Sequence, residues 1–247
     1  MTISLRAALR TIHSDPSWPR KVLIGGVLMS TLVGYPFASG LVVEHLDNSR
    51  KGFPVPLPVW RELGTRFLFG LLSAMVDFLF FVMPWLAAGL IFFCVGVGMI
   101  VATDGSDARL LFPIIGSALG ILLLSFFLLS AAPIGRLIYV EDGTPERALS
   151  GAVLREALRP DGRGVYFRAR LASLPAYLPF LVILSVTLAV IARIFDGWWP
   201  MVLPLVWLTC AALQYAHLVV MQLYVAAESQ IGGVLAEPEP KIRAPRR

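Results

Sequence analysis

Long apolar stretches bounded by charged residues constrain this chain more than any other feature of its sequence. A helix that crosses about 30 Å of hydrocarbon needs about 20 apolar residues. Five stretches of that length or longer occur: Val22–Val43, Phe67–Ala102, Leu110–Ile134, Leu171–Ala192 and Gly197–Ala227. They predict an all-α, polytopic helical membrane protein with about five membrane segments. The range is four to six, because two of the stretches exceed the length of one upright helix.

Composition agrees with this interpretation. Hydrophobic residues make up 57% of the 247 residues and charged residues 15%, against about 45–50% and about 25% in soluble domains. So few charged residues would not cover a water-soluble globule, and a disordered chain would be less hydrophobic. The net charge of +5 comes from residues beside the apolar stretches, so we expect contact with anionic lipids rather than nucleic acid.

The longest stretch, Phe67–Ala102, has two interpretations. Pro84 interrupts the hydrogen-bond ladder of a helix, so the stretch is either one kinked span or a hairpin that turns near Pro84-Trp85. We favour the kinked span, because Met83-Pro84-Trp85 lacks the polar residues typical of a turn.

The basic residues predict the orientation, because cytoplasmic loops are enriched in Lys and Arg. Models with five or six spans each place 15 of the 21 basic residues on the cytoplasmic side. A third model makes Val22–Val43 re-enter around Gly34-Tyr35-Pro36 and places 19 of them there. It needs a non-helical turn sheltered by protein at membrane depth, so we expect a continuous membrane segment instead. All three models put the 135–170 loop and the C-tail in the cytoplasm, as in a multi-pass protein of the cell membrane.

We expect a single helical membrane domain over residues 1–236, followed by a disordered, proline-rich cytoplasmic tail over 237–247. Interfacial amphipathic helices are expected in three places. The N-tail, residues 1–21, aligns Leu5, Ala8, Leu9 and Ile12 on one face, which suits a helix lying on the membrane surface. A second helix is predicted at Leu57–Arg66. The third, Pro145–Arg159 in the 135–170 loop, has Thr144 as its N-cap.

Asp77 is the one carboxylate well inside an apolar stretch, where insertion costs roughly 2.5–3.5 kcal/mol. The fifth stretch carries a polar face at helical spacing: Gln214, His217, Met221, Tyr224 and Glu228. We hypothesise an intramembrane polar site formed by Asp77, Gln214, His217 and Glu228, in which Asp77 and His217 form a proton- or cation-sensitive pair. The alternative is that each residue makes an ordinary packing hydrogen bond.

Small residues predict where helices pack closely, since they let backbones approach within the membrane. Gly26, Ser30, Gly34 and Ala38 recur every fourth residue, and Gly116 and Gly120 form a GxxxG pair. Packing within the chain or contact with a second copy would each use such ridges.

The remaining candidates concern lipid head groups and chemistry. Arg147, Arg155, Arg159 and Arg163 in the cytoplasmic loop are candidates for binding anionic lipid head groups. Cys94 and Cys210 lack the spacing of a metal site. No HExxH, GxSxG or Walker motif occurs, so we expect no enzyme activity, no cofactor and no metal.

Several short motifs add a resemblance. Ile24-Gly25-Gly26-Val27-Leu28, Gly34-Tyr35-Pro36, Pro56-Leu57-Pro58-Val59-Trp60 and Phe69-Gly70-Leu71 resemble an uncharacterised prokaryotic membrane family, the domain of unknown function 4013. The resemblance covers about residues 18–190. It implies a multi-pass membrane protein and carries no activity or catalytic residue.

Three classes of function remain open. The first is a non-catalytic scaffold or accessory subunit of a membrane assembly, with a membrane-protein partner or a second copy. The second is a small permease or channel that uses the polar face around Asp77 and His217. The third is a lipid-modifying membrane enzyme, which has the least support.

Overall fold

The computed structural model describes residues 3–31, 33–84, 86–90, 93–94, 96, 120, 131–193 and 197–235. Regular structure within these residues is helical and contains no strand, which confirms the all-α prediction. Three helical stretches are long and apolar enough to cross a membrane: Leu63–Phe80, Pro160–Ile191 and Trp199–Gly232. Most of Leu110–Ile134 and the whole of the 237–247 tail lie outside the described residues.

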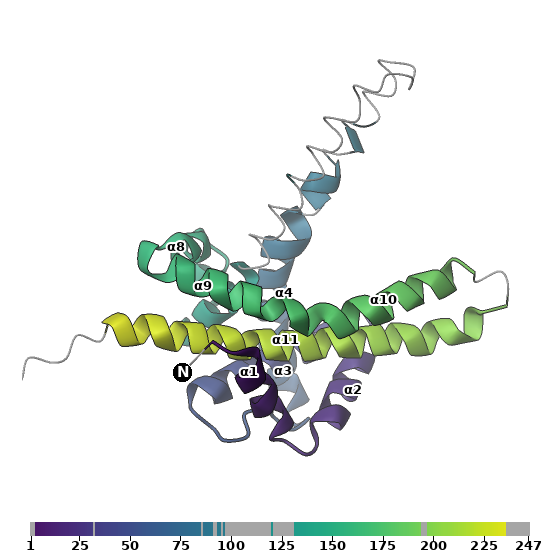
Figure 1. Ribbon diagram of the computed structural model, residues 1–247, viewed down its shortest axis with the longest axis horizontal. Coiled ribbons are helices and arrows are strands. Elements are labelled where there is room, and N and C mark those ends of the chain that lie inside the picture. The colour runs from purple at the N-terminus through teal and green to yellow at the C-terminus, as the bar shows by residue number, and fades with distance from the viewer. Residues whose placement is uncertain are drawn as a thin grey trace, which may run out of the picture.

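Helix α11 (Trp199–Leu235) is the axis around which the other helices are arranged (Figure 1). Its 37 residues span about 55 Å, more than the thickness of a hydrocarbon core. Helix α10 (Leu178–Ile191) packs along its first half, where Thr187 and Thr209 are hydrogen-bonded at 2.9 Å. Helix α9 (Pro160–Ser173) continues through the 3-10 turn η3 (Leu174–Tyr177) into α10 and packs along the rest of α11.

The predicted continuous segment Val22–Val43 is wrong, because the chain turns within it. Helix α2 (Trp18–Met29) ends before the turn and α3 (Tyr35–Arg50) begins after it, as in the re-entrant model. The Thr31 hydroxyl accepts a hydrogen bond from the Gly34 amide at 3.0 Å. A Cβ on Gly34 would lie 2.2 Å from the carbonyl oxygen of Leu28, so only glycine fits, and Pro36 suits the first turn of the next helix.

The N-tail forms helix α1 (Leu5–His13), and its apolar face packs on protein. Ala8 and Ile12 are buried in the core beside α11, whereas the sequence placed this face on the membrane surface. At the corner that follows, Lys21 donates to Asp15 at 2.5 Å and to the Leu57 carbonyl at 2.8 Å. Burial alone would raise the pKa of Asp15, but hydrogen bonds from Lys21 and Ser17 outweigh it and hold the pKa below its ordinary value.

Two of the predicted interfacial helices differ in the structure. Residues 57–62 are not helical, because Pro54, Pro56 and Pro58 supply no amide hydrogen for a helix. The predicted helix Pro145–Arg159 is divided into α7 (Pro145–Ala148) and α8 (Ala152–Leu158), and Thr144 makes no side-chain cap at the start of α7.

Helix α4 (Leu63–Asp77) leads into the π-helical turn η1 (Phe78–Val82) and projects away from α11 (Figure 1). The amide of Met83 bonds to the carbonyl of Phe78, five residues earlier. This wide turn precedes Pro84, whose ring would clash with the carbonyl four residues before it in a regular helix. Residues 83, 84 and 86–90 remain helical, which favours the kinked span over a hairpin at Pro84-Trp85.

Candidate functional site

Helices α3 and α4 pack against each other in antiparallel register, with glycines at their closest point. A Cβ on Gly70 would lie 1.7 Å from the Pro36 carbonyl oxygen, and a Cβ on Gly40 would lie 2.1 Å from the Arg66 carbonyl oxygen. This close approach brings polar side chains of the two helices together. The Ser39 hydroxyl donates to that of Ser73 at 3.0 Å, and both residues are buried.

Asp77 is the last residue of α4, and its side chain is held by residues of α3 and of the helical segment 131–142. The Tyr35 hydroxyl donates to its Oδ2 at 2.9 Å, and Arg136 of the helical segment 131–142 forms an ion pair with the same oxygen. Arg136 is only 4% exposed. The sequence identified Asp77 as a residue that must face protein, but counted Arg136 with the solvated loop and assigned no role to Tyr35.

His217 was expected to pair with Asp77. Its imidazole interacts electrostatically with Arg136 and Asp77, but no hydrogen bond joins it to Asp77 among the described residues. The Nδ1 atom of His217 is buried and has no hydrogen-bond partner among the residues that the structure describes. His217 therefore interacts electrostatically with the Asp77–Arg136 ion pair but is not hydrogen-bonded to Asp77.

The other residues of the predicted polar face serve separate contacts. Gln214 is fully buried and donates to the Ala38 carbonyl at 3.0 Å, beside Gly25. Glu228 accepts from Arg50 at the end of α3. Glu228 lies eleven positions after His217 in the same helix, about 16 Å along the axis. Glu228 therefore does not join Asp77 in one site, and the hydrogen bond described for Gln214 goes to the α3 backbone, which corrects the four-residue hypothesis.

A second polar group links α3 to α11 near the Arg50–Glu228 ion pair. The Gln222 amide nitrogen lies 2.9 Å from His45 Nε2 and also donates to the Ser49 hydroxyl. His45 is fully buried, and burial lowers its pKa to about 4. The imidazole is therefore neutral at physiological pH. His45 was not predicted as a buried residue, because it follows the apolar stretch Val22–Val43 and is flanked by Glu44 and Asp47.

The predicted packing residues have different surroundings. A Cβ on Gly26 would lie 2.6 Å from the Ala211 side chain, and Ala38 is fully buried. Ser30 is exposed and Gly34 belongs to the turn, so the four residues form no single ridge. Gly116 lies outside the described residues, and a Cβ on Gly120 would meet nothing within 4 Å.

The four candidate lipid-binding arginines lie on or beside α7, α8 and α9. Arg155 and Arg163 are exposed, Arg147 pairs with Asp142 at 2.8 Å, and Arg159 lies 3.8 Å from Glu156. Their binding to lipid head groups remains a prediction. In the part of the chain that is described, no three His, Cys, Asp or Glu side chains are grouped as metal ligands.

Comparison with known proteins gives one match. The model of a family described as "Protein of unknown function (DUF4013)" matches residues 23–192. No curated protein and no solved structure matches the chain. The matched range contains Asp77, Arg136, Tyr35 and the α3–α4 crossing, so these features fall inside the family's own domain.

Proposed function

The chain belongs to the DUF4013 family of proteins of unknown function, and we propose that it is a multi-pass protein of the cell membrane with a non-catalytic role. That role is a scaffold or an accessory subunit of a membrane assembly. One observation carries the proposal. In the part of the chain that the structure describes, ion pairs between acidic and basic side chains join different segments.

Three ion pairs make up this observation. Asp77 pairs with Arg136, Glu44 with Arg66, and Glu228 with Arg50. A charge in a low-dielectric interior is costly unless it is paired. A transport pathway, in contrast, needs charges that exchange partners with solute or water. Paired charges that connect helices suit a rigid framework better.

A stoichiometric membrane partner is the expected result of the direct test. The full-length chain, tagged at its C-terminus, is extracted with its surrounding lipid into polymer nanodiscs. Native mass spectrometry should then find a second membrane protein, or a second copy, at a fixed ratio. An unrelated multi-pass protein, tagged in the same way, is the control. A lone chain that carries solute flux in proteoliposomes would contradict the scaffold proposal.

The unpartnered Nδ1 of His217 beside the Asp77–Arg136 pair favours a second candidate, a small permease or channel. In that case His217→Gln should abolish a proton or cation flux that the wild-type chain carries at equal abundance. The scaffold proposal expects no such flux from either protein.

The helical hairpin α2–α3 supports the topology with the N-tail and the 44–66 region on the cytoplasmic side. We therefore predict that cysteines at both places react from that side, in a background without native thiols (Cys94→Ser, Cys210→Ala). An impermeant maleimide should label Arg6→Cys and Lys51→Cys in inverted vesicles but not in intact cells. Both residues are exposed.

Trp198→Cys, in the exposed connection before α11, is the control and should react in intact cells. If Arg6→Cys and Lys51→Cys reacted from opposite sides, the segment between them would cross the membrane, and the re-entrant topology would be wrong.

A further inference from the structure

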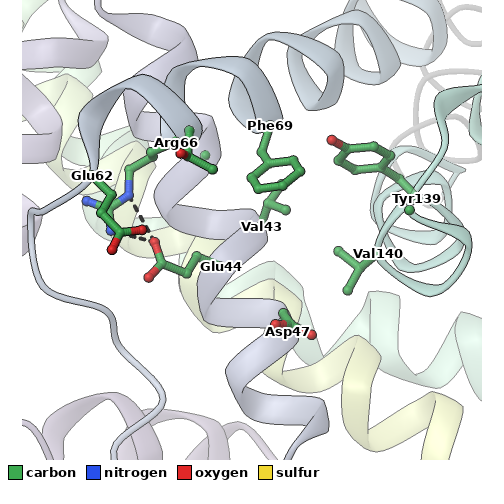
Figure 2. A pocket seen from close by; sticks show the side chains of 11 residues that line it. Val43, Glu44, Asp47, Glu62, Arg66, Phe69, Tyr139 and Val140 are labelled. Carbon is green, nitrogen blue, oxygen red and sulfur yellow. Dashed lines mark hydrogen bonds and ion pairs between the residues drawn. The ribbon is translucent and has the colours of Figure 1, made fainter.

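A pocket of about 380 Å³ opens between α3, α4 and the helical segment 131–142 (Figure 2). It lies beside the Glu44–Arg66 ion pair, separate from Asp77 and His217. Its volume is in the range of small-ligand sites. Residues of both polar and apolar character line it, among them Val43, Glu44, Asp47, Arg66, Phe69 and Tyr139.

The polar side of the pocket holds charges of both signs. Arg66 is 4% exposed, binds Glu44 and the Val59 carbonyl and lies over the Trp60 ring, yet its Nη1 atom is buried with no hydrogen-bond partner among the described residues. Glu62 lines the same side. Its backbone is left-handed, with φ 51°, and its side chain makes no cap on α4. The pocket therefore offers both an unused cationic donor and a carboxylate.

The opposite wall is apolar except for one hydroxyl. Figure 2 shows the rings of Phe69 and Tyr139 facing each other across the pocket, above Val43 and Val140. Tyr139 is 2% exposed, and its hydroxyl is buried with no hydrogen-bond partner in the described part of the chain. Burial raises the pKa of Tyr139, so the hydroxyl remains a donor. A buried polar group without a partner is costly in an empty site.

The pocket also adjoins an exposed apolar surface. Phe69 is 46% exposed and supplies the apolar surface next to the pocket, and Leu68, Leu71 and Met75 are also exposed, on another side of α4. A ligand with a hydrocarbon chain can therefore place its polar end in the pocket and its chain along α4. A purely anionic ligand fits less well, because Glu44, Asp47 and Glu62 stand against Arg66 alone among the charged lining residues.

We propose that this pocket binds a zwitterionic head group that carries a phosphate and a primary ammonium. Arg66 Nη1 and the Tyr139 hydroxyl supply donors for phosphate oxygens, and Glu62 and Glu44 supply acceptors for the ammonium. The phosphate thus meets hydrogen-bond donors, and the ammonium meets carboxylate acceptors. The two sources of this chemistry are a phospholipid of the bilayer and a soluble phosphoethanolamine.

Lipid retention tests the proposal. The full-length protein is placed in nanodiscs of equal phosphatidylethanolamine and phosphatidylcholine, and bound lipid is counted by native mass spectrometry. We expect retention of phosphatidylethanolamine over phosphatidylcholine, whose methylated ammonium donates no hydrogen bond. Glu62→Gln, on the ammonium side, should reduce that preference by about five- to tenfold, whereas Tyr139→Phe, on the phosphate side, should reduce the retention of both lipids by about the same factor.

Two controls keep the test decisive. Tyr139→Phe removes a hydroxyl that has no partner in the empty protein, so it should leave the unfolding midpoint unchanged or higher. Tyr177→Phe makes the same deletion away from the pocket and should leave lipid retention unchanged. Equal retention of the two lipids by the wild type, an unchanged preference in Glu62→Gln, or unchanged total retention in Tyr139→Phe would overturn the proposal.

A competition arm identifies the source of the head group. Soluble phosphoethanolamine should displace the lipid only in part, because it lacks the chain that contacts α4. Complete displacement at equal concentration would assign the same site to the soluble molecule.

Discussion

Replacing Asp77 by alanine is expected to lower the free energy of unfolding by about 3–5 kcal/mol. The substitution leaves Arg136, which is 4% exposed, as a buried charge without its carboxylate, and it also removes the acceptor of the Tyr35 hydroxyl. A buried charge that loses its partner costs more than the pair itself contributes. Reversible unfolding in mixed micelles, followed by circular dichroism, measures the effect.

Two comparisons separate this effect from a general loss of charge. Lys51→Ala removes an ion pair with Asp47 whose side chains are 59% and 38% exposed, and it should cost less than about 1 kcal/mol. The double substitution Asp77→Leu with Arg136→Met removes both charges and should recover most of the stability. If Asp77→Ala unfolds at the wild-type midpoint, the pair has no structural role.

The sequence predicted that Asp77 is special but not which residue holds it. Helical spacing identifies which side chains share a face of one helix, and so it placed His217 on a polar face of its own segment. It does not say which helices become neighbours. Arg136 lies two positions after the apolar stretch Leu110–Ile134. From this position we predicted that it belongs to a solvated loop.

The apolar lengths predicted helices well but not every helix break. Phe67–Ala102 and Gly197–Ala227 overlap helices long enough to span a membrane. Val22–Val43 has the same apolar length, yet it turns, because Gly34 and Pro36 with the Thr31 hydroxyl build a stable corner. The cost of a polar backbone turn at membrane depth argued against it. The structure offsets that cost by packing α2 and α3 against α11.

The polar contacts of α3 could not be predicted from the sequence either. Ser39, Glu44 and Arg50 bond to residues of α4 and α11 that are 22 to 178 positions away. Such contacts depend on the register of two helices, and that register is set by close backbone approach rather than by periodicity. The glycines at the α3–α4 crossing therefore determine helix packing more than the predicted ridge of small residues does.

Replacing Gly70 by leucine is expected to lower the free energy of unfolding by about 3 kcal/mol or more, an effect comparable to that of Asp77→Ala. A Cβ there would lie 1.7 Å from the Pro36 carbonyl oxygen and 2.5 Å from the Gly40 amide nitrogen. Backbone atoms cannot move aside as a flexible side chain can, so α3 and α4 must separate. Separation would also break the Ser39–Ser73 and Glu44–Arg66 contacts.

The same helix supplies the matched control. A Cβ on Gly64, also in α4, would meet nothing within 4 Å, so Gly64→Ala should leave the unfolding midpoint unchanged or raise the stability by up to about 1 kcal/mol. Unfolding in mixed micelles compares the two variants directly. If Gly70→Leu were as stable as Gly64→Ala, the close crossing of α3 and α4 would be wrong. The Tyr35–Asp77 contact, which depends on that crossing, would then lose its structural basis as well.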